Sequence, residues 1–181
     1  IVNAPTNTQA SILAKDITLN ASNIGKKEVI SDELVNIDSV RTKLLGGKLT
    51  IKNGAENADN VYINQTIGDL NNYDIRANGD VYIKVANGSI TDANNSVLFG
   101  DVVNLQVNNG GIDFSRSDTS LNAKSSLYAV ANDDINIKTR ENLNVNYISS
   151  LSGDVNLEST EGSIFGVGTS DFGTVKHIQD S

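Results

Sequence analysis

A short alternating segment recurs about every 20 residues along this chain, and this recurrence limits the folds that the chain can adopt. In the clearest copy, the apolar residues Val81, Ile83 and Val85 alternate with Tyr82 and Lys84. Such alternation is typical of a strand with one buried face and one wet face.

The copies keep nearly constant spacing. Residues 61–63 (Val-Tyr-Ile) precede 81–83 by 20 positions, and residues 103–105 (Val-Asn-Leu) follow them by 22. Residues 134–137 precede 154–157 by 20, and residues 16–19 are followed 18 positions later by 35–37. This spacing predicts a stacked array, in which each unit buries its apolar face only against its neighbours.

The length of the repeat also predicts the architecture. At about 3.3 Å per residue, 20 residues form one lap of three short strands and three corners. We therefore expect an all-β, right-handed parallel β-helix, a three-faced solenoid of about eight laps and about 40 Å length. The first inward positions are expected to form one core column: Val61, Val81, Val103, Ile135 and Val155.

The repeat divides the chain into three parts. We expect a polar leader or cap over 1–15, the rod over 16–168 with an irregular stretch near 114–132, and a polar tail over 169–181. The start at Ile1, without Met, indicates a piece of a longer protein.

The corners carry Asn-Gly pairs. Asn87-Gly88 and Asn109-Gly110 lie 22 residues apart, so their amides are expected to form a ladder along the rod at corners that need left-handed backbone. The alternative is an antiparallel sandwich, in which such pairs are hairpin turns. A sandwich gives no reason for constant phase from lap to lap, which favours the solenoid.

Two units of the form Gly-Asp-Val-x-Leu/Ile followed by Gly-x-Ile stand at 79–90 and 153–164. They resemble the rod repeats of filamentous-haemagglutinin-like exoproteins, the adhesins, haemolysins and leukotoxins of two-partner secretion. The resemblance covers most of residues 16–168. The family's Asn-Pro-rich secretion signature is missing, since Pro5 is the only proline and follows Ala4, so the chain resembles mid-rod.

This resemblance implies a non-catalytic structural or adhesive rod of a secreted or cell-surface bacterial protein. Its implied partners are neighbouring rod repeats and a host-cell protein or glycan. Two alternatives stay open: a carbohydrate-active β-helix enzyme and a surface-layer protein.

Composition argues against several other functions. The net charge of −8 and the absence of a basic patch argue against nucleic-acid binding. No apolar run is long enough to span a membrane. With no Cys and one His, His177, we expect no catalytic residue, metal or cofactor.

Acidic residues provide the material for the enzymatic alternative. Asp80, Asp101, Asp134 and Asp154 stand at strand starts, where stacking could align carboxylates for a lyase, a glycosidase or Ca²⁺. At such positions Asp commonly accepts hydrogen bonds from nearby backbone amides instead.

Two tyrosines are candidates for binding. Tyr62 and Tyr82 occupy equivalent outward positions one lap apart, so they are expected to stack on an exposed face. Such a face could contact a sugar or an apolar partner surface, or simply stabilise the sheet by cross-strand contact.

Overall fold

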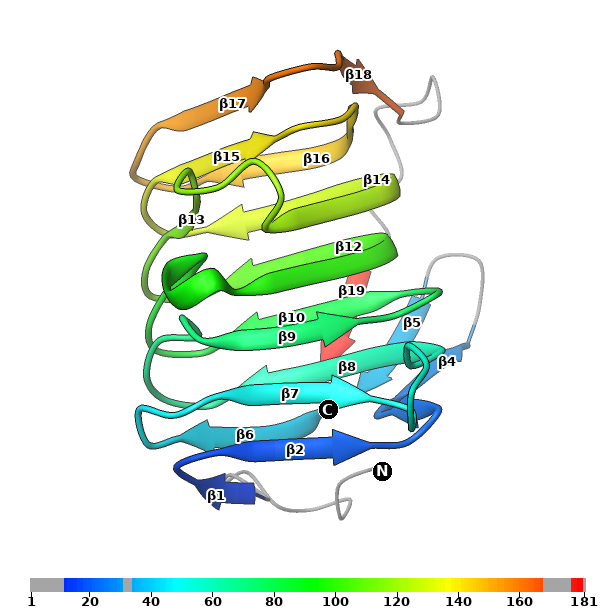
Figure 1. The fold of residues 1–181 in the computed structure, drawn as a ribbon. Coiled ribbons are helices and arrows are strands. Elements are labelled where there is room, and N and C mark those ends of the chain that lie inside the picture. Colours follow the sequence, from blue (N-terminus) through cyan, green and yellow to red (C-terminus); the bar gives the residue numbers. More distant parts are fainter. Residues whose placement is uncertain (1–11, 31–33, 168–176, 181) are drawn as a thin grey trace.

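A computed structural model describes residues 12–30, 34–167 and 177–180, and its chain coils into a parallel β-solenoid of about five turns (Figure 1). Three ladders of parallel strands run along the coil and give it three faces. The predicted solenoid and its parallel pairing are confirmed, and the antiparallel sandwich is excluded. About five turns carry all three faces, and seven strands stack in each of the two longer ladders within the described ranges, against the eight laps expected.

Face 1 carries three of the alternating segments that were singled out from the sequence. Its strands are β1 (Ile12–Ala14), β6 (Val40–Leu44), β8 (Asn60–Gln65), β10 (Val81–Val85) and the second parts of β12 (Val97–Val107), β14 (Leu121–Ala131) and β16 (Leu143–Ser150). Val61 pairs with Val81, and Val81 pairs with Val103, as the repeat predicts.

Faces 2 and 3 complete each lap. Face 2 comprises β2 (Ile17–Asn20), β7 (Leu49–Lys52), β9 (Tyr73–Arg76), the first parts of β12, β14 and β16, and β18 (Ile164–Gly166). Face 3 comprises β11 (Ile90–Thr91), β13 (Ile112–Phe114), β15 (Ile135–Thr139) and β17 (Val155–Ser159). A one-turn 3₁₀ helix, η1 (Ala93–Asn95), precedes β12.

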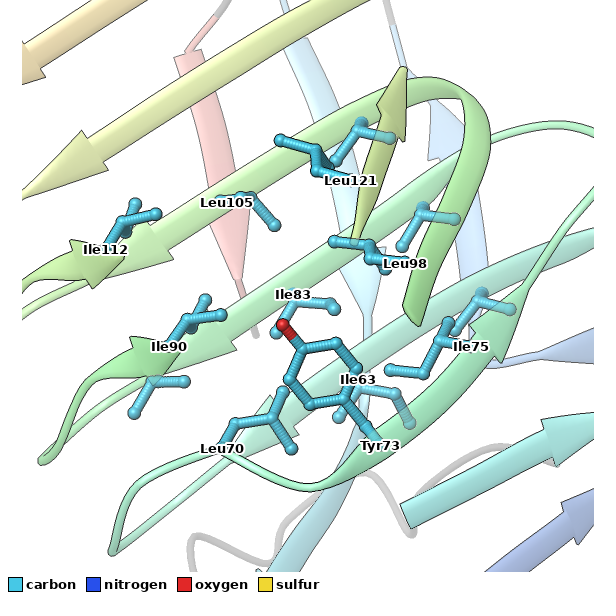
Figure 2. Packing of buried hydrophobic residues seen from close by; sticks show 14 of the residues in the cluster. Ile63, Leu70, Tyr73, Ile75, Ile83, Ile90, Leu98, Leu105, Ile112 and Leu121 are labelled. Carbon is cyan, nitrogen blue, oxygen red and sulfur yellow. The ribbon is translucent and has the colours of Figure 1, made fainter. Parts of the chain in front are cut away.

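The core is a continuous column of aliphatic side chains inside the coil (Figure 2). Ile63, Ile83 and Leu105 stack along face 1, and all are fully buried. Complete burial of such a side chain contributes about 1.5–3 kcal/mol. Each lap obtains this contribution only from the laps beside it, as in other solenoids.

The predicted core column is wrong in its second half. The residue above Val103 on face 1 is Leu127, whereas Ile135 pairs with Ile112 on face 3 and Val155 pairs with Ile135. The lap from Val103 to Leu127 has 24 residues. After Leu127 the inward residues of this strand are Ala129 and Ala131, which are too small to stand out as a pattern of large aliphatic residues.

The irregular stretch expected near 114–132 is mostly regular. β14 occupies residues 121–131 and pairs with β12 along its length, apart from a register shift opposite Gly100 and Val102. Leu121 and Ala123 are buried within it. Only the turn over 115–120 separates β13 from β14.

An insertion replaces the lap expected at residues 35–37. β4 (Lys26–Val29) and β5 (Leu34–Asp38) form an antiparallel hairpin beside the solenoid, between β3 (Asn23–Ile24) and β6. β3 pairs with β8, and β19 (His177–Asp180) pairs with β5. The alternating residues of β5 belong to this hairpin and not to a lap of the coil. The sequence did not reveal this, because an alternating pattern predicts a strand but not the sheet in which the strand pairs.

The ends of the predicted rod also shift. β1 at residues 12–14 belongs to face 1 although a cap was expected over 1–15, and β19 is a strand within the expected tail. The expected leader over residues 1–11 and the tail over 168–176 and 181 lie outside the described residues.

Candidate functional site

Side-chain oxygens at the corners accept hydrogen bonds from backbone amides of the next lap. Asp69 Oδ1 accepts from the Ser89 amide at 2.9 Å, and Ser89 Oγ accepts from the Gly111 amide at 3.2 Å. Asp134 Oδ1 accepts from the Asp154 amide at 2.8 Å. The same bond recurs from Lys48 to Asp16, from Asp80 to Asn60 and from Ser163 to Asn142. We call these bonds the corner caps.

Each corner cap follows a glycine, and this explains the repeated Gly-x-aliphatic motif. A Cβ built on Gly153 would lie 2.3 Å from Asp134 Oδ1, and one on Gly79 would lie 2.6 Å from Asn60 Oδ1. These separations are too short for real atoms. At these two corners the capping side chain of one lap therefore occupies the space where the next lap would carry a Cβ, and at Gly88 the backbone of the lap below occupies it.

The predicted Asn-Gly corners stack as expected. Asn109 Nδ2 donates to Asn87 Oδ1 at 3.0 Å, which confirms the amide ladder. The left-handed backbone falls on Gly88 (φ 137°) and Gly110 (φ 142°), whereas among the described residues other than glycine only Asn95 has a positive φ. Asn156 stacks on Asn136 in the same way, at 2.8 Å.

The four strand-start aspartates do not form one site. Asp80 forms an ion pair with Lys27 of the hairpin at 2.6 Å, and Asp101 accepts from the Ser125 hydroxyl at 2.5 Å. Asp134 and Asp154 share a corner through a corner cap. Within the described ranges, no three acidic or His side chains gather closely enough to hold a metal ion.

The tyrosine face expected to be exposed is covered. Tyr62 and Tyr82 are paired neighbours as predicted, but they are 5% and 2% exposed and form a small core with Ile37 of the hairpin. Burial, together with nearby Asp80, raises the pKa of Tyr62 far above its ordinary value. A strand pattern reveals that a residue points outward, but not that another segment covers it.

A second tyrosine pair on face 1 lies closer to solvent. Asn104 pairs with Tyr128, and Tyr128 pairs with Tyr147. The rings of Tyr128 and Tyr147 stack with centroids 5.1 Å apart, and Tyr147 is 41% exposed. A register shift before Tyr128 hid this pair from the sequence analysis, because it breaks the spacing between the two laps.

A polar groove lies where face 3 turns into face 2. Its volume is about 180 Å³, and its lining includes Asp118, Thr139, Arg140, Glu141 and Asn142. Arg140 donates to both carboxylate oxygens of Asp118, at 3.2 and 3.3 Å. These residues had not been singled out from the sequence, because Asp118 and Arg140 come from different laps.

The charged residues Asp118 and Arg140 of the groove form an ion pair between two laps. The hydrogen bond from Arg140, with a further one from Thr160, lowers the pKa of Asp118 despite some desolvation. Asp118 in turn raises the pKa of Arg140. An ionised aspartate can act as a base or nucleophile, but both carboxylate oxygens of Asp118 already accept hydrogen bonds from Arg140, and one also accepts from Thr160. The pair therefore ties two laps together.

His177 is described only by its backbone. It opens β19, where its backbone pairs with Leu34 of β5. Its side chain falls outside the described residues, as do those of the other β19 residues.

Comparisons with known proteins give no relative. No family model, no curated protein and no solved structure matches the chain. No helix in the described ranges has the length and apolarity needed to cross a membrane.

Proposed function

We propose that the chain is a structural rod segment of a large exported bacterial surface protein, an adhesin or toxin stalk. Its work is to hold other parts of that protein at a distance. The observation that carries this proposal is the use of corner side chains. Asp134, a candidate for carboxylate chemistry, accepts a backbone amide from the next lap instead, as Asn60 and Asn142 do at other corners.

The groove supports the same proposal. A lyase or glycosidase requires a side chain that takes up or releases a proton during turnover. Both carboxylate oxygens of Asp118 already accept hydrogen bonds from Arg140, and one also accepts from Thr160. The hydrogen bonds that already occupy the Asp118 carboxylate therefore support a non-catalytic role.

The exported location comes from the resemblance between the Gly-x-aliphatic units and haemagglutinin-like rod repeats. The structure gives these units a physical role at corners, which is compatible with a long rod of many such laps. A surface-layer role is less favoured, because the strands coil in parallel rather than forming sandwiches.

Two experiments test the proposal. An antibody raised against the chain should label intact source cells, and protease treatment of those cells should remove the signal. Signal only after lysis would contradict the exported location. Incubation with pectin-like polysaccharides, with and without Ca²⁺, should release no product. Release that disappears in Arg140→Gln would instead establish an enzyme in the groove.

A further inference from the structure

The last lap differs from every lap below it in the exposure of its inward side chains. Val155 of β17 and Ile164 of β18 are 42% and 46% exposed, whereas Ile135 and Leu143 directly below them are 0% and 1% exposed. Both pairs occupy the same columns of the coil. Figure 1 shows β17 and β18 as the uppermost strands. Among the residues that the structure describes, the inner wall of the solenoid is therefore open at this end.

The polar groups of this lap continue the pattern that joins the lower laps. Asp154 stands one lap above Asp134, and Ser163 stands one lap above Asn142. Their side-chain oxygens thus occupy the acceptor positions of two further corner caps. Asn156 likewise stands at the upper end of an amide stack with Asn136.

These positions specify what fits on the end. A covering lap must have glycine before each capped amide, since a Cβ there would meet the capping side chain as it would at Gly153 and Gly162. The two glycines must be nine residues apart, like Gly153 and Gly162. Aliphatic residues must follow them, to cover Val155 and Ile164.

Charge selects among segments with this pattern. From Glu141 to Val167 the chain has four acidic residues and no Lys or Arg. Glu158 already pairs with Lys138 below it, at 3.3 Å. Two such ends placed against each other would bring acidic groups together, so a second copy is disfavoured. A strand with Lys or Arg above Glu158 would continue the alternation of charge.

We propose that the open end, formed by β17 and β18, binds one further solenoid lap with two Gly-x-aliphatic corners and a basic residue above Glu158. The lap adds its strands in parallel to β17 and β18, as β-strand addition does at other sheet edges. This inference depends on the geometry of the end and not on export or adhesion.

The test uses a fluorescent peptide with the sequence of residues 151–167 carrying Glu158→Lys. Fluorescence anisotropy with the full chain should show saturable binding. The unsubstituted peptide should bind at least tenfold more weakly, because Glu158 would then face a glutamate. A peptide carrying Glu158→Lys with Gly153→Val and Gly162→Val should not bind, because both corners are blocked.

Substitutions in the chain locate the binding. The chain variant with Val155→Asp and Ile164→Asp should lose the peptide, whereas Leu13→Asp, in the first lap and 60% exposed, should retain it. Hydrogen exchange of the amides in β17 should slow when the peptide binds. Circular dichroism establishes that each variant is folded.

Three results would overturn the proposal. The first is no binding of the Glu158→Lys peptide at millimolar concentration, and the second is equal binding by all peptides. The third is concentration-dependent dimerisation of the chain that Val155→Asp and Ile164→Asp abolish, because the occupant would then be a second copy.

Discussion

Asp134 and Asp154 lie one above the other at the same corner, and the carboxylate of the first holds the backbone amide of the second at 2.8 Å. Removing the acceptor would leave a corner amide without its partner, which costs about 1–3 kcal/mol when the group is shielded from water. We expect Asp134→Ala to lower the free energy of unfolding by about 1 kcal/mol in urea denaturation. Asp134→Asn retains an acceptor oxygen and should lie within a few tenths of wild type. Equal losses in both variants would show that charge, and not the corner cap, matters there.

The glycine before a corner cap should tolerate even a single added methyl group poorly. Gly88 has a φ of 137°, and a Cβ there would lie 2.6 Å from the backbone of Gly68. We expect Gly88→Ala to destabilise the chain by about 2 kcal/mol or more, through strain and displacement of the lap. Gly166→Ala is the matched control, because no atom lies within 4 Å of its added Cβ. A thermal midpoint of Gly88→Ala equal to that of the control would contradict the close stacking.

The amide ladder should contribute less than a corner glycine. Asn87→Leu removes the acceptor of the 3.0 Å bond from Asn109 at an exposed corner. We expect a loss of about 0.5–1.5 kcal/mol, the usual net value of one hydrogen bond. Asn108→Leu, at an exposed residue beside Asn109 in the turn of the next lap, serves as the control in thermal unfolding. If the two variants melt together below wild type, added surface apolarity and not the ladder is responsible.

The covered tyrosines should behave as core residues. Tyr82 is 2% exposed, and its hydroxyl donates to Gln106 at 3.1 Å. We expect Tyr82→Ala to cost about 3–5 kcal/mol, the range of large aromatic truncations in cores. Hydrogen exchange should also accelerate in β4 and β5, since Ile37 loses its packing partner. Tyr147→Ala, at the exposed ring, should cost clearly less, and similar costs for both would mean that the hairpin does not cover Tyr82 in solution.

The solenoid could be predicted from the sequence, whereas the β4–β5 hairpin and the lap of changed length could not. The alternation at Val61, Val81 and Val103, with glycine corners near constant phase, follows directly from lap-to-lap stacking. Phase is lost where a lap changes length, as at Leu127, because periodicity carries no information across an insertion. The hairpin over Tyr62 is missed because its alternation resembles that of any two-sided strand.

The groove illustrates a different limit. Asp118 and Arg140 are 22 residues apart, and nothing in their local sequence links them. Their contact follows only once the turn over 115–120 has been placed on the coil. For the aspartates at strand starts, in contrast, the sequence suggested two roles, carboxylate chemistry or hydrogen bonding to backbone amides. The structure shows Asp134 in the second role.

The ion pair in the groove leads to a prediction about pH. Hydrogen bonding from Arg140, followed by that from Thr160, holds the pKa of Asp118 below its ordinary value in the folded chain. A carboxyl with a lowered folded pKa adds stability above its unfolded pKa, near 4, and this contribution disappears as the pH falls through the folded pKa. We expect Arg140→Gln to raise the pKa of Asp118, which NMR titration of its carboxyl carbon would measure. Thr160→Val should raise it less, because that hydrogen bond is the smaller cause. The melting temperatures of wild type and Arg140→Gln should differ at neutral pH and converge in acid, because the protonated carboxyl no longer distinguishes them. A difference that persists below the folded pKa would assign the role of Arg140 to packing of its side chain rather than to its charge.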